Sequence, residues 1–443
     1  MISERSSFRR WSSLAVVFLA LGAGIARTED PGDDRRLDAL LRVLHRARSG
    51  QPAGQRSERD TSPERARDLT ERLRGAPRSR PAPLSGIEAG QGPAVAPRLT
   101  LLVKYGGPRE SLEAAGFRVQ AQVGRVYTGT LDPEDLDRLL ALREVELVQL
   151  SREIAAPRQS PPAERQRGRQ SALAAGGLAD LSETAALDSV SGAGAVVAFV
   201  DTGVDVFHRD FRKPDGTTRI RYLLDFSSPG DIDGDGDLDG IGPFGGTLYT
   251  EAEINAGLAT PALMRQRDTT GHGTHGLSAA AGDDAVFPGV APQADLIVVK
   301  ATREDGSLGF QSADIVNALA FIDEKAGELG QPYVANLSLG TLLSSHDGRS
   351  LEEQAIDAIF GPGIPGKVVV IAAGNSSENG TSRFHHFQGA SHVGLESRHT
   401  LTVPAYTPNP DRGNDRIVLD IWYEGRDKQG IVLRPPATRP DCP

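Results

Sequence analysis

Four short runs of apolar residues set the strongest limit on how the second half of this chain can fold. The runs are AVVAFV at 195–200, DLIVVKA at 295–301, YVANLSL at 333–339 and VVVIAA at 368–373. Continuous runs of this kind are typical of strands in a parallel sheet that helices cover on both faces. We therefore expect a doubly wound, mostly parallel α/β domain over 176–396, with its functional residues at the carboxyl ends of the strands.

One helix of this domain is expected between the second and third runs, in SADIVNALAFIDEKAG. Its apolar residues Ile315, Leu319, Ile322 and Ala326 fall on a single helical stripe. Ser312 precedes the stripe and is placed to act as its N-cap.

A second, smaller unit is expected upstream, over 98–155. Segments of strand character (RLTLLVKY, FRVQAQV, RVYTGTL and VELVQL) alternate with two of helical character, PRESLEAAG and DPEDLDRLLAL. The resulting order, βαββαβ, is that of the split ferredoxin-like arrangement, which alone says little about function. A Pro/Arg/Gln-rich linker over 156–175 separates the two units and is the kind of segment that proteases cut.

The N-terminus has the layout of an export signal. Three arginines in the first ten residues precede the apolar run LAVVFLALGAGIA at 14–26, and the polar RTED follows. A run of this length is short for a stable membrane anchor, and the alternative is a buried N-terminal helix. We expect residues 1–26 to direct secretion or export to the periplasm, and the Arg/Pro-rich stretch 27–97 to be weakly ordered.

The overall charge and the cysteine content exclude some classes of function. The formal net charge is -10, which argues against nucleic acid as the main partner because phosphate binding needs a basic face. Cys442 is the single cysteine, so the chain forms no internal disulfide.

Polar residues that suit hydrolytic chemistry lie near these runs. Asp201 ends the first run in VDTGVD, although a turn-forming Asp is the commoner use of Asp-Thr-Gly. His272 and His275 lie among small residues in GHGTHG, where a zinc site would need a third strong ligand. Asn375 follows the last run in IAAGN, where its amide can stabilise a developing oxyanion or simply form a turn.

Together, these motifs resemble those of the subtilisin-like serine proteases (subtilases), whose triad runs Asp, His, Ser along the chain. The resemblance covers 176–390 and implies that Asp201 and His272 belong to the triad, with His275 as a structural companion and Asn375 in the oxyanion hole. It further implies a cleft for extended peptides, lined by Gly306, Ser307, Leu308 and Gly309 of GSLGF and by Ser338, Leu339 and Gly340 of NLSLG.

The resemblance also implies a role for the unit at 98–155. Subtilases commonly carry a βαββαβ prosegment that assists folding and blocks the active site until it is cut away. We therefore expect 98–155 to act as an intramolecular inhibitor and to be released by cleavage in the linker after Ile154.

The nucleophile is the triad member that we do not find. Ser382, in ENGTSRFHHF, comes only seven positions after Asn375 and is followed by Arg383 and bulky residues, whereas the family serine begins a helix of small residues farther along. No later Gly-Thr-Ser occurs, and 397–443 has the pattern of an inserted β-rich domain. We expect a fragment whose serine lies beyond Pro443; the alternative is an inactive pseudoprotease that binds peptide or calcium.

An acidic loop between the Asp and His motifs has the pattern of a calcium site. From its first acid it follows D-x-D-x-D-G, with Gly236 at the turn, but Gly242 stands where a bidentate acid is expected. The alternative is a solvated acidic loop. We expect Ca²⁺ to be held by Asp231, Asp233, Asp235, Asp237 and Asp239.

Overall fold

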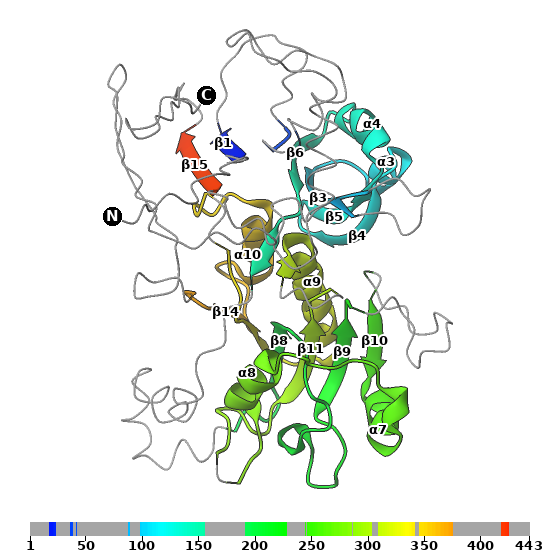
Figure 1. The fold of residues 1–443 in the computed structure, drawn as a ribbon, viewed down its shortest axis with the longest axis vertical. Helices are drawn as coiled ribbons and strands as arrows, with labels where there is room; N and C mark the ends of the chain where they lie inside the picture. The colour runs from blue at the N-terminus through cyan, green and yellow to red at the C-terminus, as the bar shows by residue number, and fades with distance from the viewer. Residues whose placement is uncertain are drawn as a thin grey trace, which may run out of the picture.

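The computed structural model describes two folded units, the smaller of which covers two helices of the larger (Figure 1). The described residues are 17–23, 36–38, 41, 87–88, 98–155, 191–227, 244, 246–285, 287–303, 309–341, 345–374 and 418–424.

The larger unit is built on a six-stranded sheet in the order β10-β9-β11-β8-β13-β14. All neighbouring strands are parallel except β10, which runs antiparallel to β9. The expected mostly parallel α/β domain is therefore confirmed, and the four apolar runs form β8, β11, β13 and β14. The strands are β8 (Val196–Asp201), β9 (Ile220–Asp225), β10 (Thr247–Thr250), β11 (Asp295–Lys300), β13 (Tyr333–Leu337) and β14 (Lys367–Ile371).

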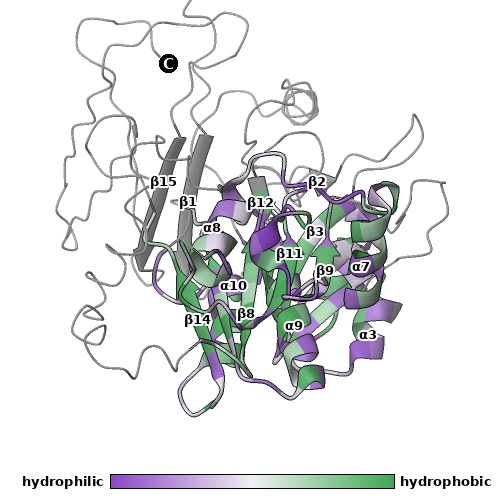
Figure 2. Cartoon of the chain, turned by 90° about the horizontal axis from the view of Figure 1, so that it is seen from below, coloured by the Kyte–Doolittle hydropathy of each residue, from purple (hydrophilic) through white to green (hydrophobic). Residues whose placement is uncertain are grey.

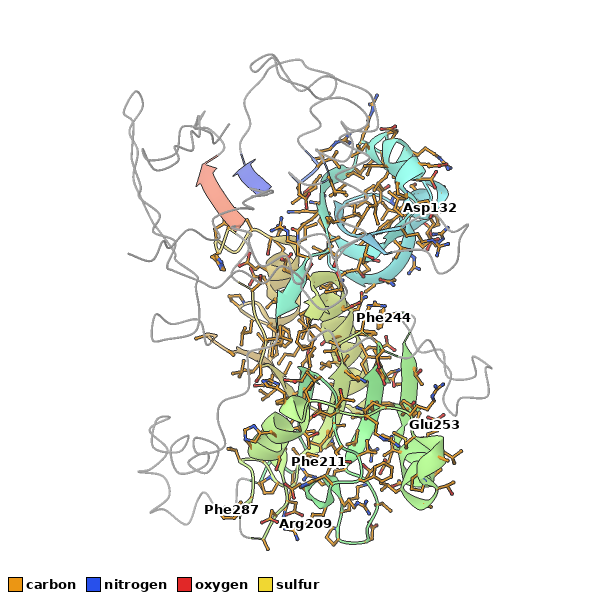
Figure 3. The ribbon with its side chains drawn as sticks, viewed as in Figure 1. Asp132, Arg209, Phe211, Phe244, Glu253 and Phe287 are labelled. Atoms are coloured by element: carbon orange, nitrogen blue, oxygen red, sulfur yellow. The ribbon has the colours of Figure 1, made fainter. Side chains whose placement is uncertain are left out.

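Helices on both faces explain why β8 and β11, in the middle of the sheet, are largely apolar. Successive residues of β8 alternate between two cores: Ala198 packs in a cluster with residues of α9 and α10, and Phe199 packs in a second cluster with residues of α8. Figure 2 shows the resulting concentration of hydrophobic residues along the central strands. Phe211 lies inside the second cluster, whereas Phe287 is at the periphery (Figure 3). The helices are α7 (Glu251–Ala259), α8 (His272–Ala281), α9 (Ser312–Leu329) and α10 (Leu351–Phe360), with 3₁₀ turns at Arg209–Phe211 (η4) and Pro261–Leu263 (η6).

The start of α9 differs from the prediction by one position. Ser312 is the first residue of the helix, and Gln311 is the N-cap. The Ser312 hydroxyl instead accepts a hydrogen bond from the backbone N–H of Arg152 at 3.1 Å. The prediction was wrong because a contact with the smaller unit uses the hydroxyl that a local cap would need.

The smaller unit confirms the βαββαβ order. In its sheet, β4, β5 and β3 are adjacent in that order. The other edge of β3 pairs with β6 and with the short β2 (Ile87–Glu88). Leu37 and Leu41, from the Arg/Pro-rich stretch, are buried in its core. The elements are β3 (Arg98–Tyr105), α3 (Arg109–Ala114), β4 (Arg118–Val123), β5 (Val126–Leu131), η1 (Pro133–Asp135), α4 (Leu136–Leu140) and β6 (Val145–Leu150).

The sheet of the smaller unit packs against α9 and α10 of the larger one. The Gln149 side chain accepts a hydrogen bond from Leu351 N at 3.1 Å and donates one to Glu352 Oε2 at 2.5 Å. Thr128 and Asn317 form a buried hydrogen bond between their side chains. The two units therefore share a continuous apolar and polar interface.

Two short pairings complete the described structure. Strand β7 (Glu153–Ala155) runs antiparallel to β12 (Gly309–Gln311), and β1 (Val17–Ala23) runs parallel to β15 (Val418–Glu424). The described part of the apolar N-terminal run is thus a strand and not a helix. None of the helices in the described ranges is long and apolar enough to cross a membrane.

Candidate active site

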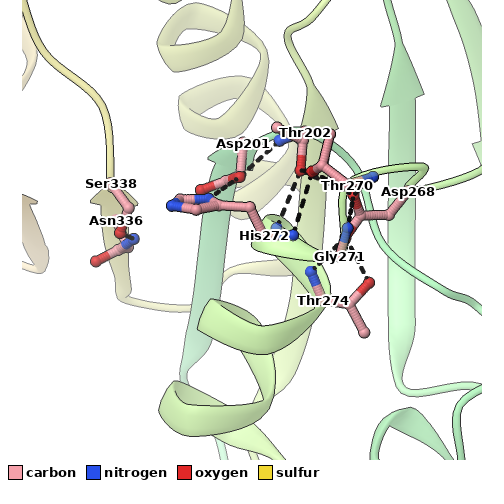
Figure 4. Close-up of polar contacts among 10 residues, drawn as sticks. Asp201, Thr202, Asp268, Thr270, Gly271, His272, Thr274, Asn336 and Ser338 are labelled. Atoms are coloured by element: carbon pink, nitrogen blue, oxygen red, sulfur yellow. Dashed lines mark hydrogen bonds and ion pairs between the residues drawn. The ribbon is translucent and has the colours of Figure 1, made fainter. Parts of the chain in front are cut away.

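Two predicted site residues meet at the carboxyl edge of the large sheet. Asp201 is the last residue of β8 and is fully buried, and His272 is the first residue of α8. His272 Nδ1 lies 2.7 Å from Asp201 Oδ1, which also accepts a hydrogen bond from Thr202 N at 2.7 Å (Figure 4). The predicted convergence of these two side chains is therefore present in the structure.

Small residues allow α8 to approach β8 this closely. Gly271, the N-cap, has a φ of 72°, a left-handed conformation that favours glycine. A Cβ on Gly276 would lie 2.7 Å from Cζ of the buried Phe199 ring, so a larger residue there would force the ring or the helix to move. The glycines of GHGTHG thus fix where the imidazole is held.

The surroundings of His272 favour its protonated form. The hydrogen bond to Asp201 raises the pKa of His272, burial lowers it, and the charges of Asp201 and Asp268 raise it further, so the pKa lies above the usual value. When Nδ1 donates to Asp201, Nε2 is left to accept a proton from a nucleophile. In Figure 4 the free edge of the ring points toward the strand that carries Asn336 and Ser338.

Asp268 is a residue of this site that our sequence analysis missed. Its Oδ2 accepts hydrogen bonds from Thr274 N at 2.8 Å and Thr274 Oγ1 at 2.7 Å, and its Oδ1 accepts one from Thr202 Oγ1 at 2.9 Å. Burial would raise the pKa of Asp268, but hydrogen bonds from Thr274, Thr202 and Thr270 outweigh it and lower the pKa. The available signal was that Gly271 has no side chain with which to cap the helix.

The segments expected to bind substrate are described in part. The Ser338 hydroxyl accepts a hydrogen bond from Asn336 Nδ2 at 2.9 Å, Leu339 is buried in the core, and Gly340 follows it. Gly309 begins β12. Gly306, Ser307 and Leu308 lie outside the described residues, as do Asn375 and Ser382.

The edge expected to pair with substrate is paired with the smaller unit. In the β7–β12 ladder, Ile154 is opposite Phe310 and Ala155 is opposite Gly309. The side chain of Ile154 is buried in the same core cluster as Phe310. An extended chain thus already adds a strand at this edge.

Two other predictions concern His275 and the acidic loop. The side chain of His275 is exposed on α8, and its backbone N–H bonds to Gly271 O at 3.1 Å. The acidic loop that holds Asp231, Asp233, Asp235, Asp237 and Asp239 lies outside the described residues. Within the described ranges, no group of three or more His, Cys, Asp or Glu side chains is placed to hold a metal ion.

Comparison with known proteins decides the family. The sequence model described as "Subtilase family" matches residues 192–415, which is half of the chain. The chain belongs to the subtilase family. The matched region contains β8, α8 and all strands of the large sheet, and so includes the Asp201–His272 pair.

Several curated proteases are similar to this subtilase. A PII-type proteinase of Lacticaseibacillus paracasei is 30% identical over 48% of this chain, and a cuticle-degrading serine protease of Arthrobotrys oligospora is 24% identical over 43% of it. The aligned regions span only 11% and 35% of those two proteins, respectively. Among solved structures, the CspB protease of Clostridium perfringens is 30% identical over 43% of this chain and 37% of its own, with a TM-score of 0.38.

Proposed function

We propose that this subtilase is an exported serine endopeptidase that hydrolyses peptide bonds in extended substrates. The observation that carries the proposal is the 2.7 Å contact between a fully buried carboxylate, Asp201, and the imidazole of His272 at the carboxyl edge of the sheet. This contact fixes the ring orientation and stabilises the imidazolium, which a hydroxyl nucleophile requires from its base.

In the proposed reaction His272 acts first as a base and then as an acid. His272 Nε2 takes the proton of a serine hydroxyl as it attacks the scissile carbonyl, and Asp201 stabilises the resulting imidazolium. His272 then gives the proton to the leaving amine. Asn375, which follows the described end of β14, would donate a hydrogen bond to the oxyanion.

An uncovered apolar face supports a place for the serine. Val334, Val368 and Val370 are 39%, 52% and 50% exposed, although they belong to β13 and β14. Their neighbours Ala335 and Val369 pack on the α9 side, so the three valines face the side of the sheet where α8 lies. A helix packed on this face would lie on the same side of the sheet as α8, whose first residue is His272.

We propose that residues 98–155 act as an inhibitory prosegment. Strand β7 occupies the edge β12, and the hydrogen bonds of Gln149 and Thr128 hold the unit on α9 and α10. A peptide substrate would use the same edge by strand addition, in which backbone hydrogen bonds give broad sequence tolerance. Cleavage after Ile154, in the linker, would then release the site.

We also propose that the acidic loop binds a structural Ca²⁺ ion. Asp231, Asp233 and Asp235 stand at alternate positions and supply hard oxygen ligands, and further acids follow at Asp237 and Asp239. Clustered carboxylates of this kind repel one another unless a cation neutralises them.

The reading frame past the codon for Pro443 tests the proposed function. We expect an open frame that encodes Gly-Thr-Ser followed by small residues, and cleavage of denatured casein by the full gene product. His272→Ala in the same product is the matched control and should abolish cleavage. A stop codon directly after Pro443, in a product that still binds peptide without cleaving it, would contradict the proposal.

A further inference from the structure

We infer that Asp268 is a positioning residue of this site: it holds Asp201 and His272 together by accepting hydrogen bonds from the segments that carry them. This inference rests on the proposed function for its catalytic meaning, but its geometry is independent of the nucleophile. Asp268 lies beside the two segments and accepts hydrogen bonds from both (Figure 4).

On the histidine side, Asp268 caps helix α8 in place of the N-cap residue. Gly271 occupies the cap position and has no side chain to satisfy the free N–H groups of the first turn. Asp268 Oδ1 accepts from Gly271 N at 2.9 Å, and Asp268 Oδ2 accepts from Thr274 N at 2.8 Å. The residues on both sides of His272 are therefore fixed by one carboxylate.

On the aspartate side, the link passes through Thr202. The Thr202 hydroxyl donates to Asp268 Oδ1 at 2.9 Å and accepts a hydrogen bond from Gly273 N at 3.0 Å. Thr202 directly follows Asp201, and its backbone N–H bonds to the Asp201 carboxylate. Moving Asp268 would therefore disturb both partners of the Asp201–His272 contact.

The chemistry of these contacts requires an ionised carboxylate. All the groups bonded to Asp268 are N–H or O–H donors from Thr202, Thr270, Gly271 and Thr274. An amide of the same shape would direct its NH₂ group at donors, leaving at least one of them unpaired.

The charge of Asp268 also acts on His272. Asp201 and Asp268 are the two carboxylates whose charges raise the pKa of His272. The residues toward which the ring points, Asn336 in β13 and Ser338 just after it, are uncharged. A carboxylate that served only as a helix cap would stabilise α8 without setting the geometry of the Asp201–His272 hydrogen bond. The two roles are distinguished by a signal from that bond itself.

Two NMR measurements on the 443-residue chain test the inference: the low-field proton signal of His272 Nδ1–H and the pH titration of the His272 ring. Both signals are assigned by their loss in His272→Gln. Asp268→Asn should lose the low-field signal and move the titration midpoint to lower pH. Asp210→Asn is the matched control, because Asp210 is also buried and bonds to α8, through Ser278, but at the far end of the helix. It should lower the melting temperature and leave both His272 readouts unchanged.

Thr202 offers a second route if Asp268→Asn does not fold. Thr202→Val removes the hydroxyl link and should weaken the low-field signal, whereas Thr202→Ser should restore it. An unchanged signal and midpoint in Asp268→Asn, or in Thr202→Val, would overturn the inference. These readouts need no nucleophile, so their failure is distinguishable from a failure of the proposed protease activity, which only the cleavage assay reports.

Discussion

Gly273, the second residue of α8, packs against the carbonyl oxygen of Gly203, and a Cβ at Gly273 would lie 2.1 Å from that oxygen. The same Cβ would lie 3.2 Å from Cβ of Asp201. This close approach joins the helix of the candidate base to the loop after the buried carboxylate. The spacing of the two catalytic candidates therefore depends on a residue without a side chain.

Gly273→Ala should destabilise the domain and separate His272 from Asp201. Because the contact is with backbone, the helix must move, and overpacking of this kind costs about 1–3 kcal/mol. Gly327→Ala is the matched control, since Gly327 lies in α9 and a Cβ there meets no atom within 4 Å. That substitution should be neutral or stabilising by up to about 1 kcal/mol. Equal melting temperatures for the two variants would contradict the packing argument.

The Asp201–His272 pair should stabilise the fold more at low pH than at high pH. Its hydrogen bond raises the pKa of His272 above the ordinary value of 6.5. A raised pKa gives a stabilisation that is fully present below the unfolded-state value and is lost as the pH rises through the folded-state value. Urea unfolding of the wild type and of His272→Gln at a series of pH values measures the contribution of His272 to the unfolding free energy, because the other titrating groups are common to both chains. A difference in unfolding free energy that does not change with pH would contradict it.

Gln149→Leu should weaken the hold of the smaller unit on the larger one. The substitution leaves the buried N–H of Leu351 without its partner, which costs about 1–3 kcal/mol, or about 5-fold to 150-fold in affinity. The measurement is the amount of the 98–155 fragment that co-elutes with the larger unit after an added protease cuts the linker.

Arg109→Ala is the control for this experiment. Arg109 pairs with Glu113 at 2.8 Å on the exposed surface of α3, and such a pair contributes about 0.5 kcal/mol or less. We expect this variant to retain the fragment as the wild type does. Co-elution of the Gln149→Leu fragment to the same extent would show that its hydrogen bonds do not hold the interface.

Chelation should lower the melting temperature if the acidic loop binds Ca²⁺. Free Ca²⁺ at about 100 times its dissociation constant would stabilise the fold by about 2.7 kcal/mol. Asp233→Asn combined with Asp235→Asn should remove the response to both Ca²⁺ and chelator. A wild-type melting temperature that is the same with and without chelator would support the solvated loop instead.

Much of the fold was predictable because strands and helices with apolar residues in regular positions leave a simple pattern in the sequence. The runs that form β8, β11, β13 and β14 are largely apolar, and segments of strand and helix character alternate over 98–155. Strands β9 and β10 were not predicted. β9 contains Arg221 and Tyr222, which interrupt its apolar character, and β10 has only four residues.

A site residue was predictable where it ends a strand, and was not predictable where contacts between distant segments determine its position. Asp201 ends a buried strand, which places it at the carboxyl edge of the sheet. Its pairing with His272 was expected from the resemblance of the two motifs to those of subtilases. Asp268 lies in a loop of threonine and glycine, where an aspartate commonly forms a turn. The side-chain-free cap residue Gly271 was a local signal for its capping contacts, but its link to Thr202 joins positions 66 apart in the sequence and has no local pattern.

The most direct test of the account is covalent labelling of the full gene product with a fluorophosphonate, followed by mass spectrometry of the labelled peptide. We predict that a single serine is labelled, in a Gly-Thr-Ser followed by small residues, and that His272→Ala or heat denaturation abolishes the label. Labelling of Ser382, labelling that does not depend on His272, or no labelling of the folded product would contradict the claim that Asp201 and His272 activate a serine.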